Sequence, residues 1–294
     1  MGISLGGREK GNGPLSLIER PMVLNSPIRA APAPASAEMI RSELAHSRSA
    51  LVALSGGVDS SVVALLVFQA LGSNAVAVTL TGAAVPSQEV RSAAEVAGTI
   101  GIEHILLPSD PLSDARYAGN PSNRCYFCRS HEGQLLRTWG AGRAIELYLD
   151  GVHLDDLGDD RPGLQAMNEH GFRHPLIEAG WTKVEVRNFA RASGLPNWDR
   201  PSNACLASRV AHGQLITASL LDRVGQAEDW LSARGFRRAR VRVSGDRARV
   251  EVDPAEVPRL QATANALPLE EVLHGLGFAV VEIDPNGYRP RSNA

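Results

Sequence analysis

The chain lacks any apolar run that approaches the ~20 residues of a membrane span. Its beginning lacks an apolar segment behind a basic start, so no signal peptide is indicated. An excess of one charge is also missing, because the formal net charge of the 294 residues is −2. Overall charge therefore favours neither a nucleic acid nor a membrane as partner. Together with the composition, these absences predict a globular protein.

Cysteine is scarce, with only Cys125, Cys128 and Cys205 among 294 residues. An odd number argues against a disulfide framework and for reduced, cytoplasmic thiols used in chemistry or metal binding. The first two form a CxxC pair, and a second CxxC is absent. Three sites stay open: zinc with His131 or His212 as fourth ligand, a redox dithiol, or a [4Fe–4S] cluster with one open iron.

Composition and pattern divide the chain into four parts. Residues 1–36 are rich in Gly, Ala and Pro without periodicity, which predicts a disordered extension. Residues 37–200 are expected to form an α/β domain. Residues 201–216 form a polar, cysteine-bearing loop, and loops of this length are usually functional or disordered. Residues 217–294 are expected to form a small α+β domain for substrate binding or oligomerisation.

The first domain alternates apolar strands with helices. This order predicts a doubly wound parallel sheet, with ligands at the carboxyl ends of the strands. A capping box, Thr182 with Glu185, starts a late helix. The expected strands cover 50–54, 75–80, 104–107 and 145–149.

The last domain is expected to contain a β-hairpin over 238–252. Arginines alternate with apolar residues along it, so one face is basic and the other apolar. The forked N–H groups of an arginine guanidinium match the oxygens of phosphate and carboxylate. The basic face therefore predicts binding of a small anion, with RNA phosphate as the alternative.

The most informative stretch is SGGVDSS, from Ser55 to Ser61, between an apolar strand and an apolar helix. Its glycines let backbone N–H groups surround an anion, and the helix adds its positive end. The spacing differs from GxxxxGK[ST], which disfavours a Walker-type kinase or GTPase. Asp59 is expected to hold Mg²⁺. The expected nucleotide phosphate ligands are Ser55, Gly56, Gly57, Ser60 and Ser61.

An aspartate-rich stretch, DGVHLDDLGDDRPG, follows the fourth expected strand. It lies at the same sheet edge as the Gly-rich loop, which predicts contacts to the nucleotide and Mg²⁺. Gly151 and Asp156 are the expected contacts, and the choice among Asp155, Asp156 and Asp159 stays open.

These motifs, with NRCYFC, GWTKVEVR and PSNACLASR in this order, resemble the LarE family of PP-loop sulfurtransferases in nickel-pincer cofactor synthesis. The resemblance runs from about Ala37 to the end of the chain. It implies that ATP adenylates a carboxylate of pyridinium-3,5-biscarboxylic acid mononucleotide and releases pyrophosphate. Sulfur then displaces AMP and leaves a thiocarboxylate. A homo-oligomer such as a hexamer is also implied.

The family uses two sulfur sources. One version sacrifices a single cysteine, at the position of Cys205, and leaves dehydroalanine. The other carries an extra sulfide on a [4Fe–4S] cluster bound by three cysteines. Because this chain also has Cys125 and Cys128, the resemblance implies the cluster version with all three as ligands, and sacrificial donation is the alternative.

The resemblance also implies a set of substrate contacts. Arg129 stands where the family commonly has Lys, so the positive charge is kept while the geometry changes. The other positions match those near the substrate phosphate: Ser208, Arg209, Glu228, Arg240, Arg242 and Glu251.

Three other interpretations stay open. A PP-loop tRNA thiolase is disfavoured by the near-neutral charge and the lack of a recognisable RNA module. An ATP-dependent amide synthase that uses ammonia would not need three cysteines. A non-catalytic, zinc-stapled nucleotide-binding protein would release no pyrophosphate.

Overall fold

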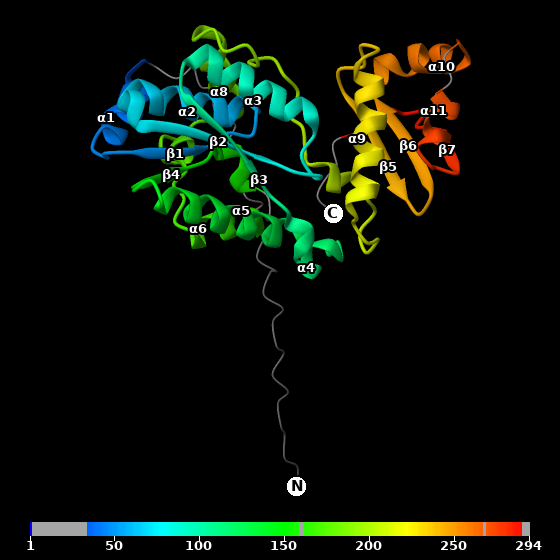
Figure 1. Cartoon of the computed structure of the whole chain (residues 1–294), viewed down its shortest axis with the longest axis horizontal. Coiled ribbons are helices and arrows are strands. Elements are labelled where there is room, and N and C mark those ends of the chain that lie inside the picture. The colour runs from blue at the N-terminus through cyan, green and yellow to red at the C-terminus, as the bar shows by residue number, and fades with distance from the viewer. Residues whose placement is uncertain (2–33, 159–161, 267–268, 290–294) are drawn as a thin grey trace.

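The computed structural model describes Met1 and residues 34–158, 162–266 and 269–289. The described chain forms two parts, a four-stranded sheet between helices and a smaller three-stranded sheet with its own helices (Figure 1). Residues 2–33 of the expected extension lie outside the described residues. Helix α1 (Pro34–Leu44) begins slightly earlier than the expected domain boundary.

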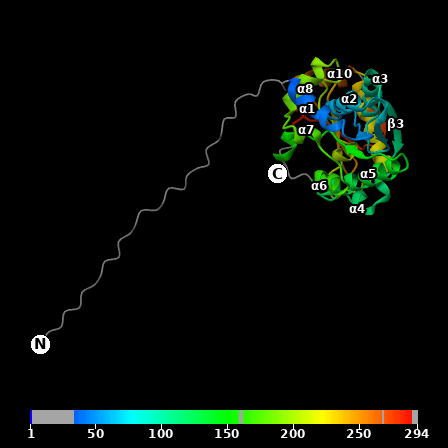
Figure 2. The same ribbon diagram turned by 90° about the vertical axis from the view of Figure 1, so that its left-hand side faces the viewer.

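The larger sheet is parallel, in the order β3-β2-β1-β4, which confirms the predicted doubly wound α/β fold. Figure 2 shows α2, α3 and α8 on one side of the molecule and α5 and α6 on the other. The strands are β1 (Ala50–Ala53), β2 (Ala75–Thr81), β3 (Glu103–Pro108) and β4 (Leu147–Leu149). The main helices are α2 (Val58–Leu71), α3 (Ser87–Ile100), α5 (Arg124–Ala141), α6 (Pro162–Glu169) and α8 (Lys183–Ala192).

Strand β1 is buried on both faces, which explains its continuous apolar sequence. Ala50 and Val52 pack with α1, α2 and α8, while Leu51 points the other way to Leu136 of α5 and Tyr148 of β4. The period-two alternation of a strand therefore fills two separate cores.

Helix α5 was not predicted from the sequence. Its buried residues are few and only one of them has a large apolar side chain, so no apolar stripe marks it: Arg124, Gly133, Leu136 and Gly140. The cysteine pair lies in its first turns, three residues apart on one face. The capping box before α8 is confirmed, since Thr182 Oγ1 accepts from the Glu185 amide and the Glu185 carboxylate accepts from the Thr182 amide.

The smaller part contains the predicted hairpin. Strands β5 (Ala239–Ser244) and β6 (Arg247–Val252) pair antiparallel, and β7 (Val280–Ile283) joins β6 in parallel. Three helices, α9 (Ala218–Ser232), α10 (Val257–Ala266) and α11 (Leu269–Gly275), accompany this sheet. The short helical segments of the chain are η1 (Gly72–Asn74), η2 (Pro111–Ser113), α4 (Ala115–Ala118), η3 (Leu154–Gly158), α7 (Pro175–Glu178), η4 (Leu206–Arg209) and η5 (Pro254–Glu256).

A search of the described helices finds none that is both long and apolar enough to cross a bilayer.

Candidate active site

A cavity of about 440 Å³ opens at the carboxyl edge of the larger sheet. Its walls are the Gly-rich loop, the start of the aspartate-rich stretch, the first turns of α5 and the segment 200–205. The loop predicted to bind nucleotide thus faces the same space as all three cysteines. The predicted site residues that line this cavity are Ser55, Gly57, Asp59, Ser60, Cys125, Cys128, Arg129, Gly151, Asp156 and Cys205.

Two predicted phosphate ligands, Gly56 and Ser61, do not line the cavity and instead hold the loop in shape. The Ser61 hydroxyl donates to Gly57 O at 2.8 Å. Buried Asn197 donates to Gly56 O and to Ser61 Oγ, at 2.9 Å each. Sequence reasoning missed Asn197, because one asparagine in a polar loop forms no pattern. Gly151 packs on this loop, since an added Cβ would stand 2.3 Å from the Ser60 nitrogen.

Replacing Gly56 with alanine is expected to lower the free energy of unfolding by about 3 kcal/mol. Gly56 has a φ of +84°, and an added Cβ would stand 2.2 Å from Glu89 O, so strain and overlap add. Gly235→Ala is the matched control, with a φ of +83° and open space around the added Cβ. It should cost about 1 kcal/mol in urea unfolding. Equal losses for the two variants would contradict the tight approach at Gly56.

Lys183 contributes a cation that sequence reasoning missed. Its Nζ lies 2.7 Å from Asp59 Oδ1, and His153 Nε2 lies 3.9 Å from the same oxygen. A signal was present in the composition. The chain has 30 basic side chains, of which only Lys10 and Lys183 are lysines. A chain that uses arginine almost everywhere else has a compact, strongly hydrated ammonium at this one cavity position.

Three aspartates were candidates for contacts to the nucleotide or Mg²⁺. Asp156 lines the cavity and accepts a hydrogen bond from the His153 amide at 3.1 Å. Asp155 is exposed and accepts from the Lys183 amide at 2.8 Å, at the start of α8. Asp159 lies outside the described residues.

Arg129 faces the cavity from α5 and is held by two carboxylates. Its guanidinium lies 2.8 Å from Glu132 Oε2 and 3.0 Å from Asp150 Oδ2. Burial alone would lower the pKa of Arg129, but the two carboxylates outweigh it and raise that pKa. His174 Nδ1 lies 2.6 Å from Asp150 Oδ1. Arg129 is therefore a fixed positive charge beside the cysteines.

The three cysteines reach the cavity from two distant segments, and none is in a disulfide. Burial raises the pKa of the Cys128 thiol, and nearby Glu132 raises it further. Metal binding at Cys128 would therefore release a proton. His131 and His212, the candidate zinc ligands, are not among the residues that line this cavity. Within the described residues, no group of three or more His, Cys, Asp or Glu side chains could hold a metal ion as placed.

Arg209 organises the loop that presents Cys205. Its side chain is fully buried, and its Nε lies 2.8 Å from Glu228 Oε1. Its Nη1 donates to Ala204 O at 2.8 Å and to Cys205 O at 3.1 Å. The buried ion pair therefore fixes the backbone on both sides of the cysteine.

A second pair supports the same loop from the hairpin. Arg242 Nε lies 3.0 Å from Glu251 Oε2, and Arg242 Nη1 donates to Ser208 O at 3.1 Å. The Ser208 hydroxyl donates to Cys205 O at 2.8 Å. Five of the predicted substrate contacts thus form a network behind Cys205, and their binding role stays a prediction: Ser208, Arg209, Glu228, Arg242 and Glu251.

Replacing Arg209 with methionine is expected to lower the free energy of unfolding by about 3 kcal/mol, because Glu228 would stay buried without its partner. Arg237→Met is the control, since Arg237 and Asp199 form an exposed pair at 3.2 Å. Its cost should be below about 1 kcal/mol. Urea unfolding of both variants measures the difference, and a small loss for Arg209→Met would contradict a structural role for the buried pair.

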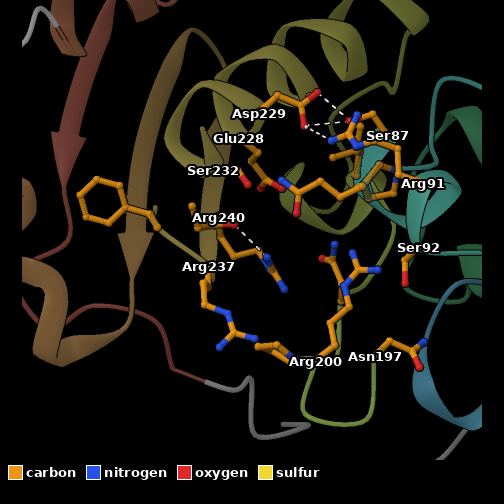
Figure 3. Close-up of a pocket in the computed structure, with 18 of the residues that line it drawn as sticks. Ser87, Arg91, Ser92, Asn197, Arg200, Glu228, Asp229, Ser232, Arg237 and Arg240 are labelled. Carbon is orange, nitrogen blue, oxygen red and sulfur yellow. Dashed lines mark hydrogen bonds and ion pairs between the residues drawn. The ribbon is translucent and has the colours of Figure 1, made fainter. Parts of the chain in front are cut away.

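A second cavity, of about 410 Å³, lies between α3, α9 and the segment 196–203. Figure 3 shows Arg200, Arg237 and Arg240 around this space. Arg240 is buried, and among the described residues it donates to Ser202 O and Ala239 O, at 3.2 and 2.8 Å. Burial first and then the charge of nearby Arg209 lower the pKa of Arg240 to about 10.

Arg200 and Asn203 line both cavities and form the wall between them. Arg200 Nη2 and Asn203 Nδ2 each donate to Glu89 Oε1 at 2.7 Å. Glu89 is mostly buried, and this burial raises the pKa of its carboxyl. The two cavities are therefore neighbours that share one polar partition.

This chain is similar to several known proteins. A family model described as NAD synthase matches residues 35–121, the part that contains the Gly-rich loop. The pyridinium-3,5-bisthiocarboxylic acid mononucleotide synthase of Lactiplantibacillus plantarum is 31% identical over 239 residues, which is 81% of this chain and 86% of that protein. An uncharacterised protein of Synechocystis is 38% identical over 252 residues, covering 86% of this chain and 94% of the relative. An uncharacterised protein of Methanocaldococcus jannaschii is 21% identical over 197 residues, covering 67% and 74%.

Proposed function

This chain belongs to the LarE family of PP-loop sulfurtransferases, and from that membership we propose that it converts a carboxylate of pyridinium-3,5-biscarboxylic acid mononucleotide into a thiocarboxylate at the expense of ATP. One observation supports this above the others. The nucleotide loop and all three cysteines line a single cavity. A carboxylate activated at the loop would therefore be within reach of sulfur without leaving the site.

The Gly-rich loop and α2 would perform the activation. The amides at the start of α2 and the hydroxyls of Ser55 and Ser60 would bind the phosphates. Asp59 and Asp156, whose carboxylates line the cavity, would hold Mg²⁺. As the substrate carboxylate attacks the α-phosphorus, Lys183 would stabilise the charge that develops on the leaving pyrophosphate. The product is an acyl-adenylate. In it the carboxylate oxygen, a poor leaving group, has become part of AMP, a good leaving group.

The cysteines would supply the incoming atom. Three thiols from two chain segments, open to one cavity, fit a [4Fe–4S] cluster, whose cysteines bind different iron atoms and can stand farther apart than the ligands of a single ion. Cys125, Cys128 and Cys205 would hold the cluster, which when bound supplies a sulfide nucleophile. Arg129 would orient the acyl-adenylate beside these thiols. Sulfur donation by Cys205 itself is the alternative within the same family.

The second cavity would hold the phosphate of the mononucleotide. Arg240 is buried without a carboxylate ion pair among the described residues, so its charge is available to an anion. Arg200 lines both cavities and would contact the substrate between its phosphate and its reacting carboxylate. The cytoplasmic location stays a prediction from the cysteine usage, and the homo-oligomer stays a prediction from the resemblance.

The test starts with protein purified without oxygen. Iron, acid-labile sulfide and the visible spectrum are measured, and the intact protein is weighed after turnover. Bound iron with an unchanged mass supports the cluster version. Absent iron, with a mass loss equal to H₂S, supports sacrificial donation from Cys205. Pyrophosphate release that depends on tRNA rather than on the pyridinium mononucleotide would contradict the proposed substrate.

A further inference from the structure

Tyr117, in the short helix α4, has a buried hydroxyl without a partner. The side chain is 1% exposed, and its Oη makes no hydrogen bond among the described residues. It lines the same cavity as the three cysteines and packs in the same apolar cluster as Cys128 and Cys205. Leaving a buried hydroxyl unpaired costs about 1–3 kcal/mol, so such a group indicates an absent partner.

Arg124, the residue before Cys125, is also buried with an unpaired hydrogen-bond donor, and it carries a positive charge. Its side chain is 5% exposed, and its Nη1 contacts Asn120 Oδ1 at 2.7 Å and His212 Nδ1 at 3.4 Å. Its Nε–H has no acceptor within the described residues. A buried cation without a carboxylate is unfavourable unless another anion lies beside it.

The other cations of this cavity show that Arg124 is different. The cavity is lined by four basic residues of the described chain. Arg129 pairs with Asp150, Lys183 with Asp59 and Arg200 with Glu89. Only Arg124, among these four, has no carboxylate partner.

The two unpaired donors lie at the cysteines. The Tyr117 hydroxyl is close enough to interact electrostatically with Arg124 and with the sulfurs of Cys205, Cys128 and Cys125. A phenol O–H, a guanidinium N–H and one uncompensated positive charge therefore belong to residues that line the cavity shared by the three thiols.

We propose that Arg124 and Tyr117 bind the anionic sulfide held at the three cysteines. The Arg124 charge compensates the negative charge of the loaded site, and the Tyr117 O–H and Arg124 Nε–H donate hydrogen bonds to sulfur. This inference rests on the cluster version of the proposed function. It makes the pair positioning residues for the sulfur that is transferred.

The test compares Tyr117→Phe and Arg124→Gln with the wild type after anaerobic loading with Fe²⁺ and inorganic sulfide. Sulfide in excess of the cluster should dissociate about tenfold faster from each variant, because a hydrogen bond to a charged group is lost. The reduction potential of the loaded site should become more negative, since donors and positive charge stabilise its reduced form. Tyr148→Phe removes another buried phenol, whose hydroxyl contacts Arg137 O at 3.5 Å, and should change neither quantity.

Arg124→Lys keeps the charge and should restore the potential toward the wild-type value. Thermal unfolding with and without iron and sulfide identifies a merely structural role, which would lower stability equally in both states. If the wild type binds iron and sulfide and both variants retain sulfide equally well, the proposed role of Arg124 and Tyr117 is wrong. The proposed function is then unaffected. A wild type that binds neither iron nor sulfide would overturn the cluster and this inference together.

Discussion

A Cys205→Ser variant is expected to release pyrophosphate at close to the wild-type rate and to form no thiocarboxylate, a loss of at least about 1,000-fold. Serine oxygen cannot donate sulfur and is a poor ligand for iron. Activation should survive, because the residues proposed for it lie on other segments, the Gly-rich loop, the aspartate-rich stretch and Lys183. A pyrophosphate assay measures the activation of the carboxylate, and mass spectrometry of the pyridinium product measures the transfer of sulfur.

Ala204→Ser is the matched control, since Ala204 is an exposed neighbour that lines the same cavity and has no thiol. It should keep both halves of the reaction. Cys125→Ser then separates the two sulfur sources. It should abolish sulfur transfer if three cysteines hold a cluster, and keep a single turnover if Cys205 is sacrificed. Repeated thiocarboxylate formation by Cys205→Ser would contradict both versions.

The second large effect is expected at Lys183. Lys183→Ala should lower kcat for pyrophosphate release by about 1,000-fold, because one preorganised positive charge on the leaving phosphates is lost. Substrate-dependent pyrophosphate release, followed at saturating ATP, measures this loss. Lys183→Arg should recover part of the rate, since the charge returns on a planar fork that cannot occupy the same position as an ammonium.

Val184→Ala is the control for Lys183, because Val184 follows it on α8 and is 58% exposed. It should leave kcat unchanged. A Lys183→Ala variant with a raised KM for ATP and an unchanged kcat would show uniform binding of ground and transition states. That outcome would contradict the proposed role in the chemical step.

Much of the larger domain could be predicted from the sequence, because its strands are short apolar runs between turn residues. β1 and the Gly-rich loop after it are examples, since neither needs a distant contact to be recognised. Helix α5 could not be predicted in the same way. It packs on the sheet through Leu136 and through Gly140, which lies against Tyr148, and one leucine beside a glycine leaves no apolar stripe.

The cysteines illustrate the same limit within the site. Their number and the CxxC spacing are visible in the sequence, but the position of Cys205 opposite α5 depends on a network of distant partners. Arg209 and Glu228 are 19 residues apart, and their pairing exists only after α9 and the cysteine loop have packed. The sequence predicted that Arg209 contacts a substrate anion. In the structure its buried guanidinium forms an ion pair with Glu228.

The wall between the two cavities has a consequence for how a ligand in one cavity affects binding in the other. Arg200 and Asn203 donate to one oxygen of Glu89, and both border the two cavities. A ligand in either cavity that draws Arg200 toward itself changes what the other cavity presents. With nucleotide and acceptor bound as proposed, their affinities would be linked, and by reciprocity each would alter the other by the same factor. A shared arginine would thus make the affinity for ATP depend on whether the acceptor site is occupied.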